Sequence, residues 1–413
     1  MSSNASNNCQ LKASSNTLIG TIAFGFLLTL SSGFGQTFFI SLFNEDLRHT
    51  FGLSHGDIGG LYFLGTLTSA VTIVWAGELL DSINLKFYTL CVTTGLFLAC
   101  ISMAFVQGAV TLALAFYLLR LFGQGLSGHT GITTASRIGA AYRGRAVSLS
   151  GLGFSTAEAI MPVVVVLLIS LYGWRNVWLY CAVFQLVVVG LLSQWILRRY
   201  NPGNVSADNS EPNQAQNSWS RAQVMRDTRF WRIAPALFAP PIISTGLFFH
   251  QQNLAAYKNV AFPLWASGIA TYSLAAVVTS LIAGFAVDRW SGSLVVQYYL
   301  LPFIAATLTA GYVDHILLPY FYYALIGATV GIATPSISAL WLEMYGPAHL
   351  ASIRSLTHAL MVSGSAIGPV IFGVLLDNGY TWATILNGSA AWMAFTTLIL
   401  ISTRLNTRAV TAS

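Results

Sequence analysis

The chain has 413 residues, of which 55% are hydrophobic and only 8% are charged, whereas a soluble domain carries roughly 25% charged residues. So few charges cannot cover a water-facing surface, which excludes an ordinary soluble protein and indicates a membrane protein. The net charge of +6 could indicate a nucleic-acid partner. In a membrane protein, however, the basic residues must first be assigned to the two sides of the membrane.

Long apolar runs recur along the whole chain. A helix that crosses a hydrocarbon core of about 30 Å needs about 20 largely apolar residues. Such spans are predicted at residues 17–43, 56–79, 87–106, 110–136, 146–170, 174–197, 231–257, 264–287, 294–313, 316–341, 355–376 and 381–402. The sequence therefore predicts an all-α membrane protein with twelve spans and both termini on one side. Ser54, just before the second run, and Asp57, at its start, predict a capping box at the beginning of this helix.

The basic residues are divided unevenly between alternate loops. Of the 19 Lys and Arg residues, fifteen fall in one set of loops and in the two tails, while Arg48, Arg175 and Lys258 fall in the opposite set. Arg120 lies inside a span. Because loops on the cytoplasmic side carry the excess of Lys and Arg, both termini are expected in the cytoplasm. The positive charge then reflects topology, and we expect no nucleic-acid partner.

One long polar segment, rich in Asn, Ser and Pro, interrupts the apolar runs at residues 198–229. It cannot be buried in lipid and predicts a cytoplasmic linker. This linker divides the chain into an N-terminal half, 1–197, and a C-terminal half, 230–413, each with six predicted helices.

The two halves repeat one pattern. The frame Gly77-x-x-x-Asp81 recurs as Gly284-x-x-x-Asp288 at an offset of 207 residues, and Pro162 recurs as Pro369 at the same offset. We interpret this recurrence as two six-helix halves with the same topology.

On the basis of these repeated residues, the segment from Thr17 to about Arg404 resembles the major facilitator superfamily of secondary transporters. The loop after the second span is similar to that family's loop between spans two and three, which latches the cytoplasmic ends of the two halves during alternating access. The resemblance therefore implies a conformational gate at Gly77, Asp81, Lys86, Gly284, Asp288 and Arg289. The alternative is that both loops are merely solvated turns.

The runs "RLFGQG", "YRGRAVSLSGLG" and "LYGWR" are similar to bacterial members related to the monocarboxylate and oxalate–formate branch. This resemblance implies a transporter in the cytoplasmic membrane that moves a small organic anion with protons, as a monomer and without a cofactor. A proton-driven drug or metabolite exporter is the alternative, suggested by 13% aromatic residues. An embedded enzyme is disfavoured, because the sequence contains no His-Glu-x-x-His motif and no Cys/His cluster.

Two charged residues are predicted at membrane depth. Arg120 lies about 25 Å above the cytoplasmic end of the fourth span and Glu158 about 20 Å up the fifth, at ~1.5 Å per residue. Intramembrane charges are costly and usually face a partner or a cavity, so we expect the two to pair. Either the pair fastens two spans, or Arg120 binds an anionic solute while Glu158 takes the coupling proton.

Neutral polar residues complete the candidate site. Gln124 follows Arg120 in the fourth span, Gln36 lies in the first span, and His250 and Gln251 lie in the seventh. The first and seventh spans commonly line the cavity in the resembled family, so we expect a shared central site, although a packing role for His250 is equally consistent. In the fourth span, small residues recur every fourth position, which predicts a helix-packing ridge: Gly123, Ser127, Gly131 and Ala135.

Overall fold

The computed structural model describes residues 2–138, 140–200, 219, 221–346 and 350–403. Within these residues the chain is helical and contains no strand. Twelve segments are long and apolar enough to cross a membrane. They are Asn16–Gly35, His55–Ser82, Leu85–Ala104, Ala109–Ser136, Gly144–Tyr172, Trp174–Tyr200, Thr228–Phe249, Phe262–Trp290, Gly292–Tyr312, Leu318–Tyr345, Leu360–Asp377 and Trp382–Ser402. The predicted all-α fold with twelve spans is confirmed.

The helices form two compact units. Unit 1 comprises Met1–Asp46 and Leu64–Ser210. Its elements are α1 (Ser2–Ser31), η1 (Ser32–Gly35), α2 (Thr37–Ile40), η2 (Ser41–Phe43), most of α4 (His55–Ser82), α5 (Leu85–Ala104), α6 (Ala109–Leu118), η3 (Leu119–Ser127), α7 (Gly128–Ser136), α8 (Ala140–Tyr172), α9 (Trp174–Phe184), η4 (Gln185–Gly190) and α10 (Leu191–Tyr200).

Unit 2 comprises Leu47–Phe63 and Glu211–Ser413. It therefore contains most of α3 (Asn44–Phe51) and the first residues of α4. Its other elements are α11 (Arg221–Arg226), α12 (Thr228–Phe249), α13 (Gln251–Tyr257), α14 (Phe262–Ser267), α15 (Ile269–Trp290), α16 (Gly292–Val296), α17 (Leu301–Tyr312), α18 (Leu318–Tyr345), α19 (Leu350–Asp377) and α20 (Trp382–Ser402).

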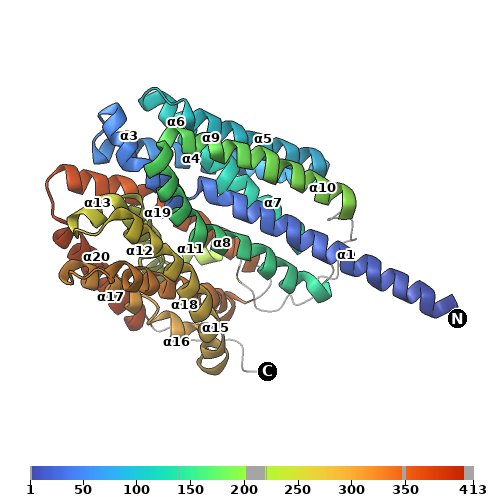
Figure 1. The fold of residues 1–413 in the computed structure, drawn as a ribbon. Helices are drawn as coiled ribbons and strands as arrows, with labels where there is room; N and C mark the ends of the chain where they lie inside the picture. The colour runs from blue at the N-terminus through green and yellow to red at the C-terminus, as the bar shows by residue number, and fades with distance from the viewer. Residues whose placement is uncertain (1, 139, 201–218, 220, 347–349, 404–413) are drawn as a thin grey trace. The chain divides into compact units, whose positions relative to one another are not determined.

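The same pairs of spans pack against each other in both units. The first span packs along the fifth (α1 with α8) in unit 1, and the seventh packs along the eleventh (α12 with α19) in unit 2 (Figure 1). The third and sixth spans (α5 with α9) correspond likewise to the ninth and twelfth (α17 with α20). This correspondence supports the proposed duplication of a six-helix half.

Most of the predicted linker, residues 201–218 and 220, lies outside the described residues. Its described ends are helical, because α10 continues to Tyr200 and α11 begins at Arg221. Val224 of α11 is fully buried in an apolar cluster of unit 2 that includes Phe230 and Trp341. The end of this polar segment is thus anchored on unit 2.

Asp227 fixes the start of α12 at this anchor. Its carboxylate accepts hydrogen bonds from the backbone N–H and the guanidinium of Arg229 and from the Tyr345 hydroxyl. Burial raises the pKa of Asp227, but these hydrogen bonds outweigh burial and leave that pKa below its ordinary value. The helix therefore starts with an ionised carboxylate at its N-terminus, where the helix dipole favours negative charge.

Candidate functional site

In unit 1 the first span is broken where one helix was expected over residues 17–43. The chain passes from α1 through the 3₁₀ turn η1 to Gln36, whose backbone is extended (φ −86°, ψ 153°), before α2 begins. The facing part of the fourth span, η3, is a nine-residue π-helical stretch that contains Arg120 and Gln124. Both glutamines, Gln36 and Gln124, are half-buried. Non-helical backbone at membrane depth is tolerated where protein buries it or where it lines a cavity, and π-helical turns are frequent at functional sites.

Two glycines bring these segments into contact. A Cβ on Gly35 would lie 2.2 Å from the Leu119 carbonyl oxygen, and a Cβ on Gly123 would lie 2.7 Å from the Gly35 Cα. Only glycine fits at either position. The predicted small-residue ridge is confirmed, since all four of its members are buried: Gly123, Ser127, Gly131 and Ala135.

Arg120 points to the break in the first span. Its side chain is only 2% exposed, and its Nη1 donates a hydrogen bond of 3.1 Å to the Gly35 carbonyl oxygen. In a continuous helix that carbonyl would accept from the Phe39 N–H, but this N–H donates to the Gln36 carbonyl instead. The break therefore releases a backbone acceptor that the guanidinium uses.

Glu158 lies on α8, which flanks the same break. The carboxylate residue is 8% exposed. Ala157 precedes Glu158 in the chain. A Cβ on Gly33 would lie 2.8 Å from the Ala157 Cβ and 2.9 Å from the Met161 sulfur, so this part of α8 is in close contact with the broken segment. Arg120 and Glu158 thus come from elements that both contact the broken segment, and both are buried where an uncompensated charge is costly. Their direct pairing stays a prediction.

In unit 2 the predicted residues belong to neutral hydrogen-bonded networks. His250 ends α12, and its Nε2 lies 2.9 Å from the Pro369 carbonyl oxygen. A carbonyl only accepts, so this nitrogen carries the proton. The fully buried Gln251 accepts 2.7 Å from the Tyr323 hydroxyl, which itself accepts 3.0 Å from the Trp265 indole N–H.

The first of the two predicted gate loops, which follows the second span, contains an ion pair whose basic partner the sequence did not single out. Asp81, with a side chain 78% exposed, pairs with Arg137 just after α7. Lys86 is exposed and contributes backbone contacts, accepting from Gln194 through its carbonyl. A Cβ on Gly77 would make only an ordinary contact of 3.7 Å with the His129 ring.

The second gate loop is held differently. Asp288 and Arg289 are exposed, and the Arg289 guanidinium lies 5.9 Å from the Trp290 ring. A Cβ on Gly284 would meet nothing within 4 Å. Here the loop is tied by its backbone, because the N–H groups at the start of α16 donate to the carboxylate of Glu343 at 2.6 and 3.0 Å. When the repeat offset of 207 residues is added to Arg137, the resulting position is next to Glu343. The internal repeat is therefore the sequence signal that could have identified both residues as partners of these loops.

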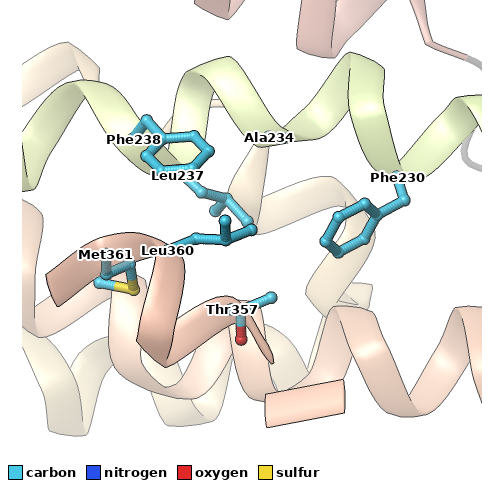
Figure 2. Close-up of a pocket in the computed structure, with 7 residues that line it drawn as sticks. All are labelled: Phe230, Ala234, Leu237, Phe238, Thr357, Leu360 and Met361. Atoms are coloured by element: carbon cyan, nitrogen blue, oxygen red, sulfur yellow. The ribbon is translucent and has the colours of Figure 1, made fainter. Parts of the chain in front are cut away.

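Two cavities in unit 2 differ in size and place. In the first, Phe230, Leu237 and Phe238 of α12 face Thr357, Leu360 and Met361 of α19 (Figure 2). Its volume is about 10 Å³, which holds at most one water molecule and no solute. The second, of about 730 Å³, is formed by the loops after α13 and before α18 together with the adjoining helix ends. It contains the Lys258–Asp314 ion pair at 2.7 Å and lies at the ends of two spans, which contribute Leu264 and Gly311 to its lining.

Twelve spans arranged as repeated helix pairs, with buried charges beside a broken helix, define a multi-pass membrane transporter. The sequence matches the Major Facilitator Superfamily over residues 25–268. The chain belongs to this family, and it transports a solute across a membrane.

Solved structures share the fold at low sequence identity. A bacterial homologue of the human lysosomal transporter Spinster, in an inward-facing and occupied conformation, aligns with a TM-score of 0.66 and 15% identity, covering 94% of this chain and 95% of that one. The nucleoside transporter NupG aligns with a TM-score of 0.73 and 14% identity, covering 94% and 99%. No curated protein matches the sequence.

Proposed function

We propose that the chain moves a small organic anion across the cytoplasmic membrane by alternating access, driven by protons, with both termini in the cytoplasm. The family supports solute transport. The resemblance of the runs around Arg120, Arg143 and Trp174 to the monocarboxylate and oxalate–formate branch supports the anionic class. In this proposal the halves 1–197 and 230–413 move about a central site.

The observation that carries the proposal is a buried guanidinium at a broken helix. Arg120 is 2% exposed and is anchored on the Gly35 carbonyl. Guanidinium groups bind carboxylates through paired hydrogen bonds of fixed geometry. A cation held at membrane depth beside interrupted backbone is a ready site for the carboxylate of a solute.

Glu158 supplies the coupling step in the proposal. While ionised, its carboxylate competes with the solute for the positive charge of Arg120. Protonation removes that competing charge, so that a proton and an anionic solute bind together. The half-buried Gln36 and Gln124 would add neutral hydrogen bonds to the solute beside this charge pair.

The experiment is uptake into proteoliposomes under an imposed proton gradient. The probes are radiolabelled mono- and dicarboxylates of up to about four carbons, and the matched controls are their neutral amides. We expect gradient-dependent accumulation of at least one carboxylate, no accumulation of its amide, and loss of accumulation in Arg120→Gln. Movement of an apolar dye against the proton direction, with no carboxylate uptake, would overturn the anion proposal in favour of an exporter.

A further inference from the structure

One short segment of unit 2 comes from the first half of the chain. Residues Leu47–Phe63 include the start of α4, a 28-residue helix that continues into unit 1. The backbone N–H groups of His55 and Gly56, in the first turn of α4, donate to the two carboxylate oxygens of Asp377 at 3.0 and 2.6 Å. Asp377 is the last residue of α19, 321 positions further along the chain.

The start of α4 does not need this carboxylate in order to form. Ser54 and Asp57 make the predicted capping box, in which each backbone N–H donates to the other residue's side chain at 3.0 Å. The first N–H groups of a helix lack partners within the helix. Here the local cap accepts hydrogen bonds from some of these groups, and the distant Asp377 carboxylate accepts from others. Because the local cap already starts the helix, Asp377 mainly adds a bond between α4 and α19.

The contact between α4 and α19 is shaped for close approach. A Cβ on Gly373 would lie 2.4 Å from the His55 carbonyl oxygen, and a Cβ on Gly59 would lie 2.7 Å from the Pro369 carbonyl oxygen. Neither position accommodates a side chain while the helices stay in contact. The first turn of α4 and the two turns of α19 that precede Asp377 therefore meet backbone to backbone.

A polar frame surrounds this contact. The Asn253 Nδ2 lies 3.3 Å from the His55 Nε2, and the Asn253 Oδ1 accepts 2.7 Å from the Trp382 indole N–H. Next to it, the Tyr62 ring packs on the Phe249 ring at 4.7 Å between centroids. These contacts join the start of α4 to α13 and α20 as well as to α12.

We propose that Asp377 is a gate residue that latches the Leu47–Phe63 segment onto α19 in one state of the transport cycle and releases it in the other. The inference rests on the proposed alternating access. The distribution of basic residues predicts that this end of the spans faces outside, so the latch closes the outer entrance. It complements the loops that contain Asp81 and Asp288 at the opposite ends of the spans.

The test measures access to the contact and needs no solute. In a chain whose four cysteines are replaced by serine, Tyr62→Cys places a reporter thiol where the side chain is fully buried. A membrane-impermeant thiol reagent is added outside intact cells. Asp377→Asn removes the charge and one of the two acceptor oxygens; since loss of a side-chain cap shifts an equilibrium by roughly 2- to 30-fold, the labelling rate should rise within that range.

Asp57→Asn is the matched control, because it removes the same charge from the same helix end but weakens only the local cap. It should change the labelling rate by less than about 2-fold. Gly373→Ala provides a second opening variant that keeps the carboxylate, and Gly388→Ala, whose Cβ would meet nothing within 4 Å, is its control. Gly373→Ala should raise labelling and Gly388→Ala should not.

Parent-like labelling in both Asp377→Asn and Gly373→Ala would overturn the latch. So would an equal rise in Asp57→Asn and Asp377→Asn, which would show fraying of the helix start. If the variants open as expected but no carboxylate is transported, the latch stands and only the proposed solute class fails.

Discussion

The two units differ in the charge that they bury within the spans. Unit 1 buries Arg120 and Glu158 beside the broken first span. The predicted site residues of unit 2, His250 and Gln251 at the end of α12, are instead hydrogen-bonded to the Pro369 carbonyl and the Tyr323 hydroxyl. Among the described residues, the buried Arg and Glu of the spans both belong to unit 1. Two units with the same helix pairing can therefore differ in polarity, one burying charged side chains and the other burying hydrogen-bonded polar side chains.

The largest effect is expected from breaking the charges of unit 1. If Arg120 and Glu158 pair, Arg120→Gln leaves an uncompensated buried carboxylate, which costs about 3–5 kcal/mol. The melting temperature in detergent should fall clearly for either single variant and recover in Arg120→Gln/Glu158→Gln. Single variants that melt like the wild type would show that the two charges are not coupled.

A smaller effect is expected from the neutral network of unit 2. Tyr323→Phe removes the hydroxyl between Gln251 and Trp265, which leaves a buried donor and acceptor without this partner and costs about 1–3 kcal/mol. Thermal stability should fall while the proton dependence of uptake is unchanged. An altered proton dependence at unchanged stability would place ionic coupling in unit 2 and remove the contrast between the units.

The smallest effects on stability are expected in the predicted gate loops, where Asp81 of unit 1 can be compared with Asp288 of unit 2. Asp81→Asn breaks an exposed pair with Arg137, worth about 0.2–1 kcal/mol, and should slow transport while solute binding is retained. Arg137→Gln should match it, and the double variant should add little. Asp288→Asn should have the weaker effect, because no side-chain partner of this exposed carboxylate is found among the described residues. Equal slowing by both Asp variants, or lost binding, would contradict this asymmetry.

The sequence predicted the features that depend on local pattern. Apolar run lengths gave the twelve spans, and the Ser54–Asp57 spacing gave the capping box. It did not predict the break at Gln36, because residues 17–43 read as one apolar run, and so it missed the Gly35 carbonyl as the acceptor for Arg120. The bond from Asp377 to the start of α4 was also missed, since a contact across 321 residues leaves no local pattern.

In the proposed mechanism, Glu158 couples solute movement to protons while Arg120 binds the anion. The most direct measurement compares two activities of Glu158→Gln in proteoliposomes: exchange of labelled carboxylate across the membrane at equal pH, and accumulation driven by a proton gradient. We expect exchange to be retained and gradient-driven accumulation to be lost, and we expect Arg120→Gln/Glu158→Gln to regain stability without accumulation. Wild-type, proton-driven accumulation in Glu158→Gln would rule out Glu158 as the coupling residue.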